Sequence, residues 1–461
     1  MLNPKSELII TGSGIRGIFN QSLKVIDAVR VSEIFSSLIG DGEIVVGRDT
    51  RPSGSPLSEA ILAALTALGR DVVDVGVAPT PSIIHAVRTL NAAGGVVISA
   101  SHNPPEWNGL KLVGTGGLLL DEEWYQKVKE QLRLGERRVT YKAEIGRRTN
   151  WNPLASHIKA ILDHVKVDRS RSSRIKVALD CGGGAGSLVT PRLLRSLGCK
   201  VTTIHCNSDG YFPRPLDPTS NALSDLSRFV TATESDVGFA HDCDADRFVC
   251  VAEDGSVLRP DEGLAIIIDD FLKETKERIV VTNIASSLII DDVAEKYGAK
   301  VVRTPVGEAY VVQEVIRRKA KIGGEGSSGG LIIPEVNYTR DGPLACAKIV
   351  EVLSKRDVSI SELLRSFPKY YYERMDVECP KSALETVFRR IAEKHKDKEL
   401  DYTDGLKVIG EKEWLLIRAS RTEPKVRILA EAESPMRAKR LCENAVEEIG
   451  KAIHEVESSK A

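Results

Sequence analysis

Apolar and polar positions along the chain follow one recurring order: an apolar strand, a loop of small residues, an amphipathic stretch, a glycine and a second apolar strand. This order occurs three times, with first strands predicted at 42–49, 174–180 and 278–283. The amphipathic stretches end at Gly69, Gly198 and Gly298, where a glycine can cap the C-terminus of a helix. Strands that alternate with helices predict mainly parallel sheets that are covered on both faces.

The spacing of the repeats indicates domains rather than a solenoid. Gly69, Gly198 and Gly298 are separated by 129 and 100 residues, which is too long and too unequal for stacked short repeats. We therefore predict an α/β protein with three related α/β domains, each built on a mainly parallel mixed sheet. The predicted ranges are 1–151, 152–255 and 256–369, followed by a fourth domain at 370–461.

The fourth domain is predicted to be smaller and of the α+β class. Strands are expected within 370–380, 405–420 and 425–434, and helical periodicity covers 381–396 and 435–455. The second of these helices begins after Ser434, a candidate N-cap, and has Pro435 in its first turn.

Charge and composition then narrow the classes of partner. The 461 residues include 64 basic and 65 acidic ones, and aromatic residues make up only 5% of the chain, so a nucleic-acid partner is not expected. No apolar run approaches the roughly 18 residues of a membrane span, and the N-terminus lacks the pattern of a secretory signal. We expect a cytoplasmic protein without a membrane partner. The sequence carries no signal for an oligomeric state.

The first cluster of candidate chemistry is "VVISASHNPPEWNGLKL" at 96–112, where an apolar strand becomes a polar loop. Ligands of open parallel sheets bind beyond the carboxyl ends of the strands, and Ser101 occupies such a position. A serine hydroxyl needs a base or a strong charge field to react, and His102, Asn103 and Lys111 are near it in sequence. The alternative is a turn whose polar side chains make only local hydrogen bonds.

The second cluster is "AHDCDADRF" at 240–248, in which Asp242, Asp244 and Asp246 alternate with other residues. In extended form the chain would place these three carboxylates on one side, where they suit a hard cation such as Mg²⁺. The loop does not match the calcium-binding EF-hand pattern, because Arg247 takes the place of its glycine. A solvated acidic turn is the alternative.

Two further clusters offer contacts to a sugar and to a phosphate. In "GGEGSSGG" at 323–330, preceded by "RTPVGEAY" at 303–310, a carboxylate and two serines could pair with adjacent sugar hydroxyls, although a flexible glycine-rich turn is the alternative. In "IRASRTEPKVRI" at 417–428, several cations and hydroxyls could bind a phosphate dianion, although an exposed loop would have the same composition. The polar side chains of this fourth cluster are Arg418, Ser420, Arg421, Thr422, Lys425 and Arg427.

In this order the four clusters resemble the α-D-phosphohexomutase family, which comprises phosphoglucomutases and phosphomannomutases, over essentially the whole chain. "SASHNPPEWNGLKL" resembles the phosphoserine loop of that family, and "DCDADR" resembles its metal loop. "GGEGSS" resembles its sugar-specificity loop, and "RASRTEP" resembles its phosphate-binding loop.

The resemblance implies a role for each site residue. Ser101 would carry a phosphoryl group, and Mg²⁺ would be held by a phosphoserine oxygen together with Asp242, Asp244 and Asp246. Lys111 would match the general base of the family, and the remaining residues near the phosphoserine would be His102, Arg16 and Arg247. The substrate-binding residues would be Thr304, Gly307, Glu325 and Ser327 for the sugar, and Arg418, Ser420, Arg421 and Thr422 for its phosphate.

Several positions depart from the pattern of the family. Cys243 stands where the metal loop usually has glycine, which predicts an ordinary backbone conformation there. Ser328 also replaces a glycine, and Arg421 replaces the glycine of the phosphate loop. Glu308 follows "PVG", where relatives often have histidine, lysine or aspartate, and "ITGSGIRG" replaces a Phe-Gly-Thr entry motif. These departures bear on the choice of sugar rather than on the phosphoryl chemistry.

The predicted function is a Mg²⁺-dependent phosphohexomutase that acts on glucose or mannose phosphates, with hexose 1,6-bisphosphate as intermediate and activator. Because the two phosphates of this intermediate exchange places, a fourth domain on a hinge is expected. The nearest alternative is a phosphoglucosamine mutase, because Glu325 could bind a hydroxyl or an ammonium group. A metal-dependent sugar phosphatase and a noncatalytic sugar-phosphate-binding protein are the more remote alternatives.

Overall fold

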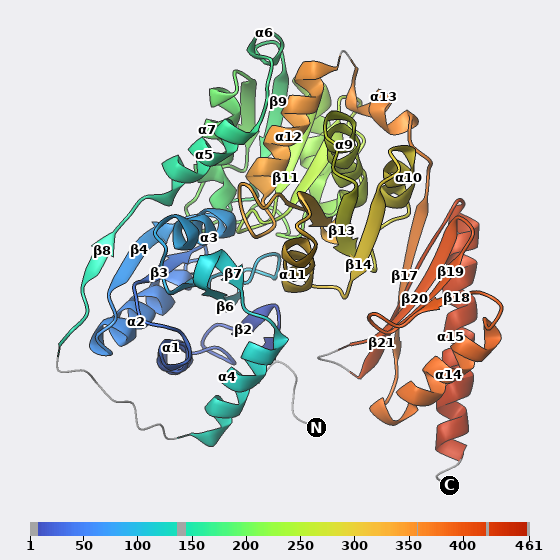
Figure 1. The fold of residues 1–461 in the computed structure, drawn as a ribbon, viewed down its shortest axis with the longest axis horizontal. Coiled ribbons are helices and arrows are strands. Elements are labelled where there is room, and N and C mark those ends of the chain that lie inside the picture. Colours follow the sequence, from blue (N-terminus) through green and yellow to red (C-terminus); the bar gives the residue numbers. More distant parts are fainter. Residues whose placement is uncertain (1–7, 136–143, 357, 421–423, 459–461) are drawn as a thin grey trace.

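The computed structural model of the chain describes residues 8–135, 144–356, 358–420 and 424–458 (Figure 1). In these residues four β-sheets follow one another along the chain. The first three are mixed sheets with helices packed against them, and the fourth is antiparallel. The predicted fold class, three related α/β domains and a smaller α+β domain, is confirmed.

The relationship among the first three domains is visible in the order of their strands. Four strands lie in the order β4-β3-β5-β6 in the first sheet, β10-β9-β11-β12 in the second and β14-β13-β15-β16 in the third. In each set the first three strands are parallel and the fourth is antiparallel. The same topology is therefore used three times, and the first domain extends it with further strands at both edges.

The helices and strands of the first two domains have the following bounds. The first domain contains β1 (Ile9–Thr11), β2 (Gly14–Ile18), α1 (Val25–Leu38), β3 (Ile44–Arg48), α2 (Gly54–Ala67), β4 (Val72–Val77), α3 (Thr80–Thr89), β5 (Gly94–Ile98), β6 (Trp107–Gly114), β7 (Leu118–Leu119), α4 (Glu122–Leu134) and β8 (Arg148–Asn150). The second contains α5 (Pro153–His164), α6 (Arg169–Ser172), β9 (Lys176–Asp180), α7 (Thr190–Ser196), β10 (Lys200–Ile204), α8 (Ser224–Ala232), β11 (Val237–His241) and β12 (Phe248–Ala252).

The third and fourth domains continue the chain. The third contains α9 (Pro260–Glu274), β13 (Ile279–Asn283), α10 (Ile289–Lys296), β14 (Lys300–Thr304), α11 (Glu308–Arg318), β15 (Ile322–Glu325), β16 (Gly330–Ile332), α12 (Gly342–Lys355) and α13 (Ile360–Arg365). The fourth contains β17 (Tyr371–Glu378), α14 (Leu384–Lys394), β18 (Glu399–Asp401), β19 (Leu406–Gly410), β20 (Glu413–Ala419), β21 (Lys425–Ala432) and α15 (Pro435–Ser458). Short 3₁₀ helices lie at Thr115–Gly117, Ala185–Leu188, Ser220–Leu223, Gly326–Ser328 and Lys381–Ala383.

Glycine ends the three predicted amphipathic helices. Gly69, Gly198 and Gly298 follow α2, α7 and α10 within two residues and have φ angles of 76°, 100° and 62°. A residue with a Cβ atom is strained in this left-handed region, whereas glycine is not. The predicted helix ends are therefore confirmed, and each glycine turns the chain into the next strand.

The fourth domain has one strand and one turn that the pattern did not predict. The apolar stretch at 405–420 forms two strands, β19 and β20, joined by a tight turn in which Lys412 has a φ angle of 56°. The short β18 pairs with β19 at the edge of the sheet. At the start of α15 the backbone N–H of Arg437 donates to the Ser434 hydroxyl at 3.3 Å, which confirms the predicted N-cap.

Packing joins the domains unequally. One continuous apolar core contains residues of both the second and the third domain, because α12 packs against α7 and α9 (Figure 1). In contrast, the fourth domain has a core of its own between its sheet and its helices α14 and α15. A small cluster that includes Ile284 and Trp414 connects it to the third domain. None of the helices in the described part of the chain has the length and apolarity that crossing a membrane requires.

Candidate active site

A cavity of about 460 Å³ lies where the four domains meet, and each domain contributes to its wall. Most of the residues that the sequence singled out line this cavity. They are Arg16, Ser101, His102 and Lys111 from the first domain, Arg247 from the second, Gly307, Glu325 and Ser327 from the third, and Arg418 and Ser420 from the fourth. Thr304 does not line the cavity and its hydroxyl donates to the Pro305 carbonyl at 2.9 Å, while Arg421 and Thr422 lie outside the described residues.

Ser101 follows β5 in a sharply turned loop. Its φ angle is 52°, a left-handed conformation that costs a residue with a side chain roughly 1 kcal/mol. The Ser101 hydroxyl donates to Asp242 Oδ2 at 2.6 Å and lies 3.3 Å from His102 Nδ1. The Ser101 hydroxyl of the first domain is therefore in direct contact with the acidic loop of the second domain.

His102 and Arg16 supply the polar surroundings of this hydroxyl. Burial, together with the positive charges of Arg247 and Arg16, lowers the pKa of His102 to about 2, so its imidazole is neutral at pH 7. Arg16 donates to the Asn103 side chain at 3.2 Å, and its Nε is buried without a hydrogen-bond partner. Arg16 therefore carries the positive charge next to Ser101, and His102 does not.

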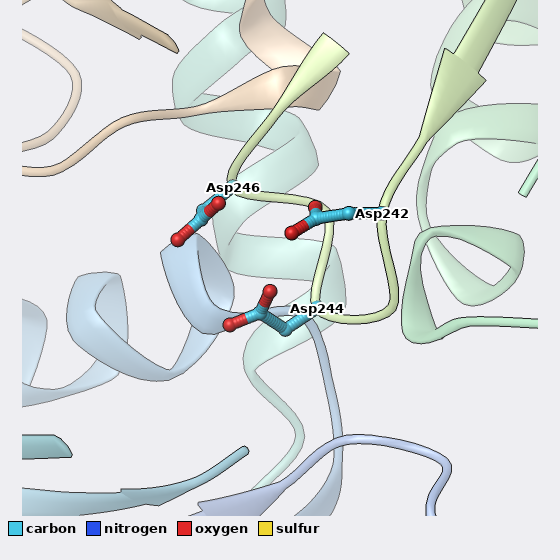
Figure 2. A group of neighbouring side chains, drawn as sticks. All are labelled: Asp242, Asp244 and Asp246. Carbon is cyan, nitrogen blue, oxygen red and sulfur yellow. The ribbon is translucent and has the colours of Figure 1, made fainter. Parts of the chain in front are cut away.

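The acidic loop between β11 and β12 gathers three buried carboxylates. One oxygen from each of Asp242, Asp244 and Asp246 lies within 4.8 Å of the others, and Figure 2 shows the three groups converging on one space. The expectation that an extended chain aligns them was wrong. The loop is a turn that reverses at Ala245, whose φ angle is 52°, while Cys243 has a negative φ as predicted.

The protonation of these carboxylates reflects their crowding. Burial and the charges of Asp246 and Asp244 raise the pKa of Asp242 well above its ordinary value. Burial alone would also raise the pKa of Asp246, but the positive charges of Arg340, Lys111 and Arg247 lower it. Asp244 Oδ1 and Asp246 Oδ1 are buried without a hydrogen-bond partner. Free oxygens on clustered carboxylates fit a hard divalent cation.

Lys111, on β6, reaches the same carboxylates. Its ammonium donates to Asp244 Oδ2 at 2.6 Å and to Asp246 Oδ2 at 3.0 Å. Burial would lower the pKa of Lys111, but the two negative charges raise it above its ordinary value. In this arrangement Lys111 is charged and holds a proton, which is the opposite state from that of a base.

Arg340 is a central residue of the site that the sequence analysis missed. Its guanidinium donates to Asp246 at 2.7 Å and to Glu325 at 3.0 Å, and its Nε lies 3.2 Å from Glu308. Arg340 lies in the loop before α12, outside all four clusters, and only its position beside Asp341, the N-cap of α12, marks the segment in the sequence. It connects the acidic loop to Glu325 at the end of β15.

Glu325, the last residue of β15, is held at the cavity wall by the last residue of β13 and by the loop that follows β14. Glu325 Oε1 accepts from the Asn283 side chain at 3.0 Å and from the Gly307 N–H at 2.9 Å. Gly307 has a φ angle of 140°, which glycine adopts without strain. Ser327 lies 3.4 Å from the Asn283 amide, so its hydroxyl is held beside the carboxylate. The two groups form one polar edge of the cavity.

Glu308, one of the departures noted above, also lines the cavity. Its carboxylate accepts from the Thr339 hydroxyl and, at 2.7 Å, from the Arg340 N–H. Burial raises the pKa of Glu308, and the positive charge of Arg340 opposes this effect. Two carboxylates, Glu308 and Glu325, therefore stand next to each other around one arginine.

The fourth domain closes the cavity with cations. Arg418, near the end of β20, donates to Asp404 Oδ2 at 2.6 Å, and the same oxygen accepts from the Val306 N–H at 2.9 Å. Arg427 and Ser420 line the cavity beside it. Asp404 therefore connects the candidate phosphate loop to the loop of the third domain that carries Gly307.

Comparison with known proteins agrees with this fold and site. Models of the phosphoglucomutase/phosphomannomutase alpha/beta/alpha domains I, II and III match residues 8–138, 155–255 and 259–371, and the model of the C-terminal domain matches residues 375–448. The chain therefore belongs to the phosphoglucomutase/phosphomannomutase family, the α-D-phosphohexomutases. Its class of activity is that of an isomerase that transfers a phosphoryl group within a hexose phosphate.

Individual relatives carry two kinds of name. A phosphoglucomutase/phosphomannomutase of Thermococcus kodakarensis is 39% identical over 450 residues, covering 95% of this chain and 98% of that protein. A probable phosphoglucosamine mutase of Methanopyrus kandleri is 37% identical, covering 96% and 98%. The crystal structure of a family member from Burkholderia thailandensis matches with a TM-score of 0.85 and 25% identity over 98% of both chains. Phosphohexomutase activity follows from these matches, and the names leave the sugar open.

Proposed function

We propose that the enzyme interconverts the 1-phosphate and the 6-phosphate of glucose or mannose through a phosphoserine at Ser101 and a hexose 1,6-bisphosphate intermediate. The observation that carries this proposal is the contact between the Ser101 hydroxyl and Asp242 at 2.6 Å, at one wall of a cavity that also contains Arg418 and Arg427. A phosphoryl donor at one wall and a phosphate clamp at another suit a substrate with phosphate at either end.

In the first transfer the bond between phosphorus and the Ser101 oxygen breaks while the free hydroxyl of the hexose phosphate forms a new bond to phosphorus. The proton of that hydroxyl is taken up by Lys111 as a neutral amine and ends, in the net reaction, on the serine oxygen. The position of Lys111 in the same cavity wall as Ser101 supports this role, which requires that Lys111 first lose the proton that Asp244 and Asp246 now stabilise. The second transfer is the reverse reaction with the other phosphate.

A magnesium ion fits the acidic loop. Asp242, Asp244 and Asp246, together with an oxygen of the phosphoserine, would hold it, because two of the buried carboxylate oxygens have no hydrogen-bond partner. When bound, the ion would neutralise charge on the transferring phosphoryl group. Arg16 and Arg247, whose Nε atoms are both buried without a partner, would contribute positive charge at the same centre.

The substrate would be bound through its sugar hydroxyls and through the phosphate that is not being transferred. Glu325 and Ser327 would bind adjacent sugar hydroxyls, with Gly307 orienting the carboxylate through its N–H at 2.9 Å. Arg418 and Ser420 would bind the phosphate that is not being transferred, and Arg421 and Thr422 of the same loop would add to this clamp. Thr304 would act only through the backbone of this segment, because its hydroxyl is directed at Pro305.

A second candidate is a phosphoglucosamine mutase. The pair of carboxylates Glu308 and Glu325 at the cavity wall favours this substrate, because an ammonium group gains more from two negative charges than a hydroxyl does. The pairing of both carboxylates with Arg340 favours the neutral sugars, since much of this negative charge is already balanced.

Phosphorus NMR would test the proposal and choose between the sugars. The purified protein would be incubated with Mg²⁺ and a trace of hexose 1,6-bisphosphate, and separately with the 1-phosphates of glucose, mannose and glucosamine. We expect conversion of the glucose or mannose substrate to the 6-phosphate without free phosphate, and loss of this conversion in Ser101→Ala or after removal of the metal with EDTA. Faster conversion of glucosamine 1-phosphate would select the second candidate. Release of inorganic phosphate would mean a phosphatase, and no change with any sugar would contradict both mutase assignments.

A further inference from the structure

We propose that Arg51 is a positioning residue for the phosphoryl transfer, because its buried guanidinium holds the loop that carries Ser101 in its reactive conformation. This inference rests on the proposed function in one respect, namely that Ser101 is the residue that carries the phosphoryl group. Arg51 belongs to the loop "TRPSGSP" that follows β3 and does not itself line the cavity.

The sheet topology explains how Arg51 reaches this loop. Strands β3 and β5 are parallel neighbours in the first sheet, with Arg48 at the end of β3 paired with Ile98 at the end of β5. The loops that follow them therefore start side by side at the same edge of the sheet. Arg51 follows the end of β3, and Ser101 follows the end of β5.

Every N–H group of the Arg51 side chain has an acceptor. Nη2 donates to the carbonyl oxygens of Ser101 and Asn103, both at 2.7 Å, and Nη1 donates to those of Pro104 at 2.7 Å and Trp107 at 3.0 Å. Three carbonyl groups of the loop and that of Trp107, the first residue of β6, are thus gathered around one planar group. An arginine side chain offers five N–H donors in a fixed plane, and the fifth of them, on Nε, donates to Asp49.

The charge of Arg51 is balanced locally. Its Nε donates to Asp49 Oδ2 at 3.2 Å, its backbone N–H donates to Asp49 Oδ1 at 2.9 Å, and both side chains are fully buried. Ser99 donates to the same carboxylate at 2.6 Å, and the Ser99 hydroxyl in turn accepts from the Ser101 N–H at 2.9 Å. The contacts of Arg51 with the loop are all to backbone carbonyls, so its effect on the reaction is geometric rather than electrostatic.

The same segment also contacts the acidic loop of the second domain. Thr50 donates to the Gly183 carbonyl at 2.9 Å, and its hydroxyl lies 3.7 Å from the Cys243 sulfur, between two of the clustered aspartates in sequence. Residues 49–51 therefore contact both the loop that carries Ser101 and the loop that carries Asp242. A left-handed Ser101 is strained, and the network around Arg51 supplies the contacts that keep it in place.

Arg51→Lys tests this role, because lysine keeps the charge but cannot offer five donors in one plane. Arg70→Lys is the matched control. Arg70 also binds backbone carbonyls, those of Ser36, Ile39 and Gly40 at the end of α1, but it precedes the start of β4, at the opposite end of the parallel strands from Ser101, and does not line the cavity. Both variants lose a comparable set of hydrogen bonds, so the comparison separates an effect on the reaction from a general loss of stability.

Two measurements would be made on the full chain with Mg²⁺. In steady-state kinetics we expect kcat of Arg51→Lys to fall about 100-fold without an increase in KM, since displacement of a reacting group by about 1 Å has an effect of this size. In hydrogen exchange we expect amides of 99–107 to exchange at least tenfold faster in Arg51→Lys. Arg70→Lys is expected to change neither quantity.

The outcomes distinguish this inference from the proposed function. Wild-type kcat in Arg51→Lys, or unchanged exchange of 99–107, would overturn the positioning role while leaving the mutase assignment intact. If the wild-type protein transfers no phosphate, the proposed function fails, and the exchange measurement alone decides whether Arg51 orders the loop. If Arg51→Lys does not fold, Asp49→Asn replaces it, with an expected tenfold loss of kcat, and an unchanged kcat would again overturn the inference.

Discussion

Cys243 lies in the acidic loop between two candidate metal ligands, at a position where glycine is usual in the family. Because cysteine has a side chain, we predicted an ordinary backbone conformation for Cys243. The structure agrees, since the residue of this loop with a left-handed conformation is Ala245 and not Cys243. Alanine is an uncommon residue in that region, so no sequence signal marks the position of the turn. The metal-binding chemistry of this loop could be predicted from its residue types, but the turn of its backbone at Ala245 could not.

A second single residue, His241, makes the free energy of unfolding depend on pH. Burial lowers the pKa of His241 to about 4, below the ordinary value of 6.5 that it regains in the unfolded chain. Between pH 6.5 and about 4 the unfolded chain is therefore protonated at His241 while the folded protein is not. The neutral, buried His241 contributes its full share to the free energy of unfolding above pH 6.5, and this share is lost as the pH falls from 6.5 to about 4. The loss expected from this residue is about 3 kcal/mol in the free energy of unfolding.

His241→Asn would remove this contribution. The variant should be less stable at pH 7, because the hydrogen bond between His241 Nε2 and Thr190 is lost, but its Tm should fall less between pH 7 and pH 4 than that of the wild type. Thermal unfolding at the two pH values measures both effects. His454→Asn, at an exposed position of α15, is the control and should keep the wild-type dependence. An equal fall of Tm in His241→Asn would contradict the assignment.

At the scale of elements, three of the four candidate loops occupy one topological position. The loop with Ser101 joins β5 to β6, the loop with the aspartates joins β11 to β12, and the loop after Glu325 joins β15 to β16. Each connects the third strand of a repeat to its antiparallel fourth strand. The sequence predicted the three repeats from their periodicity and the loops from their composition. It did not show that the loops are equivalent, because the fourth strands follow loops of different length and chemistry.

Asp404 connects two loops of different domains, because it pairs with Arg418 of the fourth domain and accepts from the Val306 N–H of the third. Asp404→Asn would keep an acceptor for the Val306 N–H but remove the charge that pairs with Arg418. With its partner charge lost, Arg418 would be less well fixed, and we expect KM for the hexose phosphate to rise about tenfold, which corresponds to about 1.4 kcal/mol, with kcat nearly unchanged.

Asp292→Asn is the matched control for this measurement. Asp292 also joins the third and fourth domains, through Tyr370 and Lys412, but it does not line the cavity. Its substitution should leave KM at the wild-type value. A similar rise of KM in both variants would mean that Asp404 acts on the attachment of the domain rather than on Arg418.

For the whole molecule, the second and third domains share one apolar core, whereas the fourth domain is joined to the third by a small apolar cluster and by polar contacts. Glu431 lies at the centre of this attachment and is fully buried. Its carboxylate accepts from Trp414 Nε1 at 3.0 Å and from the Leu288 N–H at 2.8 Å, and lies 3.3 Å from Arg259. An attachment of this limited size suits the hinge that the proposed turnover of a bisphosphate would require.

Glu431→Gln is expected to loosen this attachment. The amide removes one of the two carboxylates that pair with Arg259, the other being Glu262. It also places an NH₂ donor beside the three donors that now face Glu431, at a cost of about 2 kcal/mol. Small-angle X-ray scattering should show a larger radius of gyration without substrate and contraction when hexose phosphate is added. Glu413→Gln, which breaks ion pairs to Lys398 and Arg437 within the fourth domain, should leave the radius unchanged. An unchanged radius in Glu431→Gln would argue against a hinge at this interface.

The sequence by itself determined the α/β class, the three repeats, the helix ends at Gly69 and Gly298, and the types of residue that face the cavity. Periodicity and turn chemistry are local properties, and a sequence displays them directly. Only the tertiary structure decided that Arg340 joins Asp246 to Glu325, that Asp404 holds Arg418, and that Arg51 gathers the carbonyls around Ser101. These contacts join residues from different elements or domains, so they depend on how the domains pack, which no local pattern of apolar and polar positions records.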